Sequence, residues 1–191
     1  MDNYLKILLF LAKNREQKFT MHEISNLTKI PYATFFRTVQ RMKNLIDFTK
    51  IGKATVIDLK ENNLALNSHL SVASFQETED YLEKNPIFKK ISSELQKGIY
   101  SVLLFGSFAK GMQNSKSDID LLIINKNGEK NLNFSKYETI FSKEINPIFV
   151  SEKEFKIMLS EKEENLGKQA LKANVILHNP DYFWRLVFNG V

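Results

Sequence analysis

The stretch that decides the fold covers residues 99–124 and reads IYSVLLFGSFAKGMQNSKSDIDLLII. It opens with an apolar run, residues 99–105, whose length and β-branched content are typical of a buried strand. Gly106 and Ser107 interrupt that run, and we expect a helix from Phe108 with Ser107 as its N-cap. Free backbone N–H groups at this helix start, together with the Ser107 hydroxyl, predict a phosphate-binding site.

Two carboxylates, Asp118 and Asp120, stand at the start of a second apolar strand in the same stretch. Because side chains alternate along a strand, residues at i and i+2 point to the same face. Carboxylates in an apolar strand are costly unless cations compensate their charge. A pair of Mg²⁺ ions that bridges both groups to a nucleoside triphosphate (NTP) meets that requirement. The alternative is a hairpin edge on which both carboxylates are solvated.

The order strand, Gly-Ser, spacer and Asp-x-Asp strand resembles the DNA polymerase β nucleotidyltransferase superfamily, and most of all its minimal members. The resemblance is spread over residues 86–150. It implies an α/β (α+β) domain whose small mixed sheet is flanked by helices, with Asp118 and Asp120 as catalytic ligands of a two-metal Mg²⁺ site. The residues it implies for the triphosphate are Gly106 and Ser107. Lys110, one turn into the helix, is a further candidate for a phosphate contact, and a solvent-exposed lysine is the alternative.

The superfamily places a third acidic residue on a neighbouring strand, which we expect over residues 144–150. That residue holds a metal and helps to deprotonate the attacking hydroxyl. Glu144 and Asn146 lie two positions apart and therefore share a face, so either residue could occupy the position. We predict that Glu144 occupies this position and is the third catalytic and metal-binding carboxylate. Asn146 could bind a metal weakly but could not accept a proton.

The excess of positive over negative residues is confined to the first third of the chain. Residues 1–66 contain 11 Lys/Arg and 6 Asp/Glu, a net charge of +5, whereas residues 67–191 contain 16 of each. A basic segment joined to a neutral one is typical of a nucleic-acid-binding module attached to a partner domain. A charge that serves only solubility is the alternative.

The first third also has the pattern of a winged helix-turn-helix. Apolar spacing predicts helices at residues 2–13, 21–28 and 31–44, with a capping box at Thr20 and Glu23, and strand-like segments at 48–51 and 55–59 predict a hairpin. In such a domain the third helix enters the major groove and the hairpin contacts the backbone or the minor groove. The DNA contacts expected are Tyr32, Thr34, Arg37 and Arg41 on the helix and Lys50 and Lys53 on the hairpin. A winged helix used for protein contacts is the alternative.

We therefore expect a winged-helix domain at residues 1–66, a linker or connecting helix at 67–85, and a nucleotidyltransferase domain with C-terminal helices at 86–191. A capping-box pattern at Ser74 predicts the start of the connecting helix, and one at Ser151 predicts a charged helix that continues toward Ala173. The last helix, after Pro180, is so apolar that it must be buried. Core packing is the default, and a contact between copies of the chain is the alternative.

Composition excludes several classes of protein. The chain of 191 residues has no Cys, which excludes disulfides and thiolate zinc sites and agrees with a cytoplasmic location. No apolar run reaches the length of a membrane span. The resulting expectation is a Mg²⁺-dependent enzyme that transfers a nucleoside monophosphate from an NTP to an unidentified acceptor and binds duplex DNA. The resemblance makes a protein acceptor plausible, such as a toxin modified by an antitoxin. The alternative is a DNA-binding regulator whose nucleotidyltransferase domain senses nucleotide or is inactive.

Overall fold

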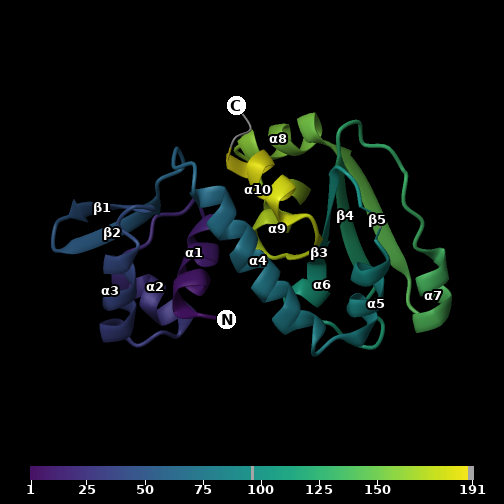
Figure 1. Cartoon of the computed structure of the whole chain (residues 1–191), viewed down its shortest axis with the longest axis horizontal. Helices are drawn as coiled ribbons and strands as arrows, with labels where there is room; N and C mark the ends of the chain where they lie inside the picture. Colours follow the sequence, from purple (N-terminus) through teal and green to yellow (C-terminus); the bar gives the residue numbers. More distant parts are fainter. Residues whose placement is uncertain (96, 189–191) are drawn as a thin grey trace. The chain divides into compact units, whose positions relative to one another are not determined.

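The computed structural model describes residues 1–95 and 97–188, and the chain divides into two compact units, Met1–Ala73 and Ser74–Val191 (Figure 1). The boundary falls inside one helix, α4 (Leu66–Leu82). No described helix is long and apolar enough to cross a membrane.

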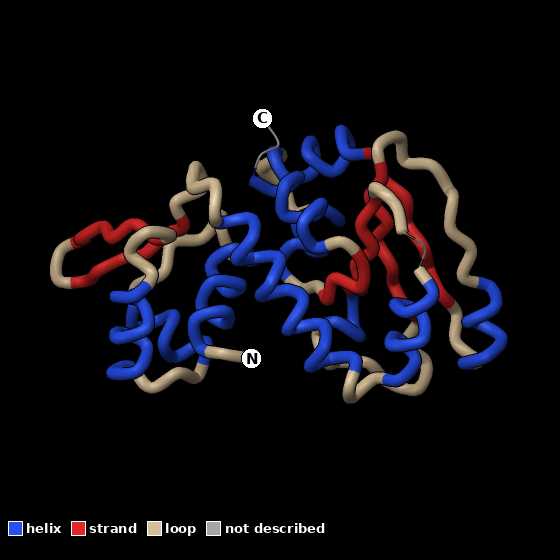
Figure 2. Tube along the Cα trace, viewed as in Figure 1, coloured by secondary structure: helices blue, strands red, loops and turns tan. Residues whose placement is uncertain are grey.

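The first unit consists of three helices followed by a two-stranded antiparallel hairpin, drawn in red after the first three blue helices in Figure 2. Their bounds are α1 (Asn3–Lys13), α2 (Met21–Thr28), α3 (Tyr32–Arg41), β1 (Ile46–Ile51) and β2 (Ala54–Leu59). The predicted three helices and hairpin are confirmed, although α3 ends before residue 44.

Local sequence explains how these elements begin and end. Thr20 caps α2: its hydroxyl accepts a hydrogen bond from the Glu23 amide at 3.2 Å, and the Glu23 carboxylate accepts one from the Thr20 amide at 2.7 Å. The predicted capping box is therefore confirmed. The buried side chains of the three helices include Ile7, Leu8, Ile24, Phe35, Val39 and Met42. Leu27 of α2, in contrast, is 57% exposed.

The capping-box prediction at Ser74 is also wrong. Ser74 lies in the middle of α4 and is fully buried, and its hydroxyl accepts a hydrogen bond of 2.8 Å from the indole N–H of Trp184. A buried indole N–H needs an acceptor. The serine therefore serves tertiary packing within the second unit and does not begin a helix.

The second unit is built on a four-stranded mixed sheet with the strand order β5-β4-β3-β6. Strand β3 is antiparallel to β4 and to β6, whereas β4 and β5 are parallel. The strands are β3 (Tyr100–Phe105), β4 (Ile119–Asn125), β5 (Ile145–Ser151) and β6 (Val175–His178). The predicted α+β class with a mixed sheet flanked by helices is confirmed; strand β6 was not expected from the sequence.

Helices cover both faces of this sheet (Figure 1). One face packs with the end of α4, α5 (Pro86–Glu94), α6 (Gly106–Ala109) and α7 (Ser135–Phe141) in a continuous apolar cluster. The strands on the other side contact α8 (Glu152–Ser160), α9 (Leu166–Lys172) and α10 (Pro180–Phe188). Phe183 and Trp184 of α10 are fully buried, which agrees with core packing of the last helix.

The charged segment after Ser151 differs from its prediction in one respect. The capping box itself is confirmed: the Ser151 hydroxyl accepts from the Glu154 amide at 3.1 Å. The helix, however, ends at Ser160 rather than continuing toward Ala173, and α9 begins anew after Asn165. The Asn165 side chain caps α9 by accepting from the Lys168 amide at 3.1 Å.

Candidate functional site

The site residues predicted from the Asp-x-Asp motif lie at the beginning of β4. Ile119, Leu121 and Ile123 of this strand are fully buried in the apolar cluster on one face of the sheet. Because side chains alternate, Asp118 and Asp120 point to the opposite face, where α8, α9 and α10 pack farther along the strands. The strand thus buries one face and presents two carboxylates together on the other.

Gly106 lies directly against the carboxylate of Asp120. Phe105, at the end of β3, is the register partner of Asp120, and Gly106 follows with φ +69°. A Cβ at Gly106 would lie 2.2 Å from Asp120 Oδ2, closer than two atoms can pack. A side chain at position 106 would therefore force the Asp120 carboxylate to move and would add the strain of a left-handed φ, and glycine avoids both.

The short helix after β3 starts earlier than the sequence suggests. It covers Gly106–Ala109, and Phe105 rather than Ser107 occupies its N-cap position, without a side-chain capping bond. Ser107 lies half-buried in the first turn, and Lys110 follows the helix with an exposed side chain. The N-cap prediction for Ser107 is wrong, but Gly106 lies beside Asp120 and Ser107 follows it directly in the chain.

The register of β5 separates the two candidates for the third acidic position. Asn146 is the parallel partner of Asp120, and its side-chain amide hydrogen-bonds to the Asp120 carboxylate. Glu144 lies one position before β5; its backbone carbonyl accepts a hydrogen bond of 2.9 Å from the Ile119 amide, and its side chain is exposed. The structure therefore places an amide beside Asp120, whereas the predicted Glu144 is level with Asp118.

The electrostatics of Asp120 are unfavourable for a lone carboxylate. Burial raises the pKa of Asp120, the negative charge of Asp118 raises it further, and the hydrogen bond from Asn146 acts in the opposite direction. A divalent cation would relieve the desolvation and the repulsion together. Among the described residues no group of three or more His, Cys, Asp and Glu side chains is arranged to hold a metal ion. The donor set that fits Mg²⁺ here is therefore two carboxylates, with the Asn146 amide oxygen as a neutral third donor.

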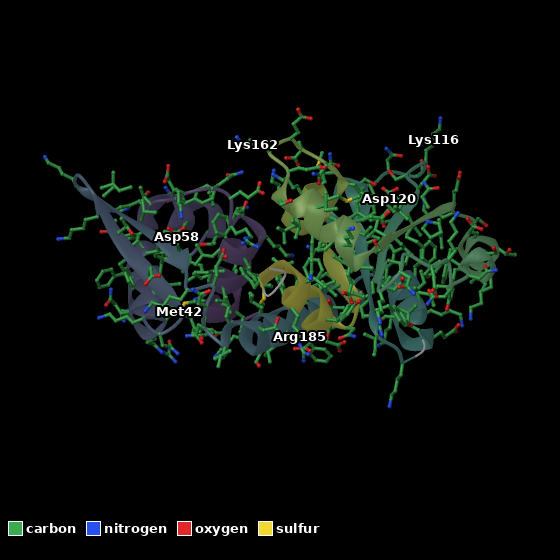
Figure 3. The ribbon with its side chains drawn as sticks, turned by 90° about the horizontal axis from the view of Figure 1, so that it is seen from above. Met42, Asp58, Lys116, Asp120, Lys162 and Arg185 are labelled. Carbon is green, nitrogen blue, oxygen red and sulfur yellow. The ribbon has the colours of Figure 1, made fainter. Side chains whose placement is uncertain are left out.

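A lysine that sequence reasoning missed holds the loop that precedes Asp118. Lys143 Nζ donates to the backbone carbonyls of Ser115 and Ser117 at 3.0 and 3.2 Å, in the loop that leads into Asp118. Figure 3 labels Lys116 on the same loop and Asp120 on the strand that follows it. No motif marks Lys143, because its role depends on β5 lying beside β4, a pairing that sequence spacing does not reveal.

The residues predicted to contact DNA lie on α3 and on the hairpin of the first unit. Arg37 and Arg41 are exposed on α3, and Thr34 is half-buried. Tyr32 stacks on His22 with ring centroids 3.9 Å apart. The hairpin residues predicted for phosphate contacts are Lys50 and Lys53, both exposed. The sequence did not predict the exposed apolar side chains that accompany them on these elements, namely Phe36, Phe48 and Ile51.

Taken together, β3, the Gly-Ser turn and the Asp pair on β4 define a domain of the nucleotidyltransferase type. The family model of the nucleotidyltransferase domain matches residues 86–183, slightly more than half of the chain, and the chain belongs to this family. Membership supports transfer of nucleoside monophosphates in general. No curated protein and no solved structure matches the chain.

Proposed function

We propose that this protein is a Mg²⁺-dependent nucleotidyltransferase that transfers a nucleoside monophosphate from an NTP to an acceptor and that also binds duplex DNA. The observation that supports it most is the contact between Gly106 and Asp120 inside the matched domain. This close approach supports the proposal because the turn proposed to bind phosphate then adjoins the aspartates proposed to bind metal.

Each residue of the site has a proposed role. Asp118 and Asp120 hold Mg²⁺, which when bound supplies charge neutralisation at the triphosphate. Gly106 and Ser107 contribute the backbone N–H groups and the hydroxyl that orient the terminal phosphates, and Lys110 supplies a further cation. Catalysis of this kind depends on positioning and charge stabilisation and requires no covalent intermediate.

Incubation with α-labelled NTPs, Mg²⁺ and candidate acceptors tests this proposal. Label should appear in an acceptor with the wild type and disappear with Asp118→Asn or Asp120→Asn, whereas NTP binding without Mg²⁺ changes little. Asp80→Asn is the matched control, because it removes an exposed carboxylate of α4 outside the site. Equal NTP affinity with and without Mg²⁺ would contradict the metal role of the two aspartates.

The second part of the proposal is that the first unit binds duplex DNA, and it is to be tested with the full-length protein. We expect α3 to read the major groove and the hairpin to contact phosphates, as in a winged helix. With about five phosphate contacts, log K should fall with log salt at a slope of about −4 to −5. Arg37→Ala should relax sequence preference, whereas Lys53→Ala should weaken binding to all sequences alike. Absence of any shift on DNA at low salt would exclude this part.

A second function is favoured by one specific observation, the amide at Asn146 beside Asp120. In that version the protein is a DNA-binding regulator whose second unit binds nucleotide without transferring it. Mg²⁺-dependent NTP binding that changes DNA affinity, with no label transferred to any acceptor, would support the regulator over the enzyme.

A further inference from the structure

The end of β5 carries a chemical feature that bears on the acceptor. Asn146 lies beside Asp120, where a side-chain amide can neither accept a proton nor carry a negative charge. Asp118 and Asp120 are engaged as the cation-holding pair under the proposed function. Among the described residues there is no third His, Cys, Asp or Glu side chain grouped with them for a metal.

A hydroxyl acceptor needs a general base, and the Asn146 amide beside Asp120 cannot serve as one. A hydroxyl must lose a proton as it attacks the α-phosphorus, and a positioned base typically contributes about 10²–10⁴-fold to such a step. An oxygen that is already anionic attacks with a free electron pair and loses no proton. The new oxygen–phosphorus bond forms, the bond from the α-phosphorus to the bridging oxygen breaks, and its electron pair leaves with diphosphate.

We propose that the acceptor presents an anionic oxygen, that of a phosphate monoester or a carboxylate, in place of a hydroxyl; this rests on the proposed function. The chain then needs no base beside Asp120, and Asn146 is a specificity-determining residue. It lets an anionic acceptor approach without the repulsion that a third carboxylate would exert.

Charges around the site agree with an anionic acceptor. The Lys143 ammonium is fixed against the loop before Asp118 by its bonds to Ser115 and Ser117. The same loop carries the exposed Lys116. Lys143 Nζ also lies over the Phe108 ring of the apolar cluster, on the face opposite the aspartates, so the charge features that bear on the acceptor are Lys116 and the neutral amide of Asn146. A phosphate monoester, with a second pKa of about 6, is mostly dianionic at neutral pH.

Glu144 is the residue that could reverse this conclusion. It shares the face of Asn146 and is level with Asp118, but its side chain is exposed and lies before the strand begins. If Glu144 served as the base, Glu144→Gln would lower transfer to a hydroxyl by about 10²-fold or more. The inference predicts that Glu144→Gln changes transfer to anionic acceptors less than threefold.

Three minimal acceptors, inorganic phosphate, acetate and glycerol, test the inference with the full-length wild type, ATP and Mg²⁺. Labelled phosphate should appear as the β-phosphate of ADP with release of diphosphate, which ordinary hydrolysis cannot produce. Acetate should give an acyl adenylate that hydroxylamine traps, if the acceptor is a carboxylate. Either anionic product should exceed glyceryl-AMP at least tenfold, and a glycerol product that equals or exceeds both would overturn the inference.

The isosteric variant Asn146→Asp sharpens the test. It should raise transfer to glycerol by about 10²-fold and lower transfer to phosphate. It should also weaken calorimetric binding of phosphate to the complex with Mg²⁺ and a non-hydrolysable ATP by about tenfold, since a like charge is added within a few ångströms. Unchanged phosphate affinity would contradict the inference. Absence of transfer to all three acceptors by both proteins, despite intact ATP binding, would reject the proposed function itself.

Discussion

Strand β4 lies in the interior of the sheet and strand β5 at its edge, and the two hold the proposed site by different means. On β4 the carboxylates are fixed by a buried apolar face below and by Gly106 beside Asp120. On β5 the site residue Asn146 is followed by Pro147 and by Ile148, which is 36% exposed. An edge strand tolerates proline, because one side of its backbone needs no N–H donor for a ladder. The comparison indicates that packing fixes the position of the carboxylates on β4. On β5, by contrast, the site side chain can be replaced with little loss of fold stability.

The largest expected effect comes from adding a methyl group on the β4 side. Gly106→Ala combines a left-handed φ of +69° with a Cβ placed 2.2 Å from Asp120 Oδ2, and it should lower the free energy of unfolding by about 2–5 kcal/mol. NTP binding should be lost as well. Chemical denaturation and calorimetry measure the two effects.

Gly111→Ala is the matched control for that substitution. Gly111 has φ +66°, but nothing lies within 4 Å of a Cβ built there, so only backbone strain of about 1–2 kcal/mol is expected. Equal destabilisation by the two variants would show that the contact with Asp120 does not determine the turn.

The second prediction compares two residues paired across the strands on the face of the carboxylates. Leu122 on β4 is fully buried and its register partner Ile148 on β5 is partly exposed. Leu122→Ala should cost about 2–5 kcal/mol in the free energy of unfolding, whereas Ile148→Ala should cost about 1 kcal/mol or less. Urea titrations of both variants measure the difference, and equal costs would remove the distinction between interior and edge.

The sequence could predict the β4 side well and the β5 side only partly, for physical reasons. An apolar run, a Gly-Ser break and alternating carboxylates are local patterns, and they specify a strand, a turn and a shared face. Alternation gives the face of Glu144 and Asn146 but not the register, which depends on how β5 pairs with β4. Sequence spacing could not choose between them.

Other errors have the same origin in tertiary packing. The capping boxes at Thr20 and Ser151 form because their partners are three residues away. The similar pattern at Ser74 fails because a distant residue, Trp184, uses its hydroxyl inside a continuous helix. Strand β6 has only four residues and pairs with β3 far away in the chain, so no local period reveals it.

The third prediction concerns the hydrogen-bond partner of a backbone amide at the start of the edge strand β5. The Ile145 amide donates to Glu138 Oε1 at 3.0 Å, a side-chain acceptor in place of another strand. Glu138→Ala should cost about 1 kcal/mol and accelerate hydrogen exchange of the Ile145 amide. Glu138→Gln keeps an acceptor oxygen and should retain most of the protection. Unaltered exchange in Glu138→Ala would show that the edge is satisfied in another way.

The smallest effect is expected from an exposed ionic group that ties α7, which contacts β5, to α5. Glu94 accepts hydrogen bonds from Lys136 and Tyr137 of α7 and pairs with Lys90. Lys136, Lys90 and Tyr137, in that order, lower the pKa of Glu94 to about 2 from 4.5. A lowered pKa stabilises the fold above the unfolded value, so this contribution should be lost as the pH falls from about 5 to 2. Thermal unfolding of Glu94→Gln should show a shallower pH dependence in that window, and an identical slope would contradict the assignment.

The most direct test of the central claim is a structure of the protein with Mg²⁺ and a non-hydrolysable NTP. The account predicts Mg²⁺ at about 2.0–2.1 Å from oxygens of both Asp118 and Asp120, with the triphosphate against Gly106 and Ser107. Asn146 should lie beside the metal site and Glu144 outside it. A nucleotide bound elsewhere, or a metal ligated by Glu144 and not by the aspartate pair, would contradict the account.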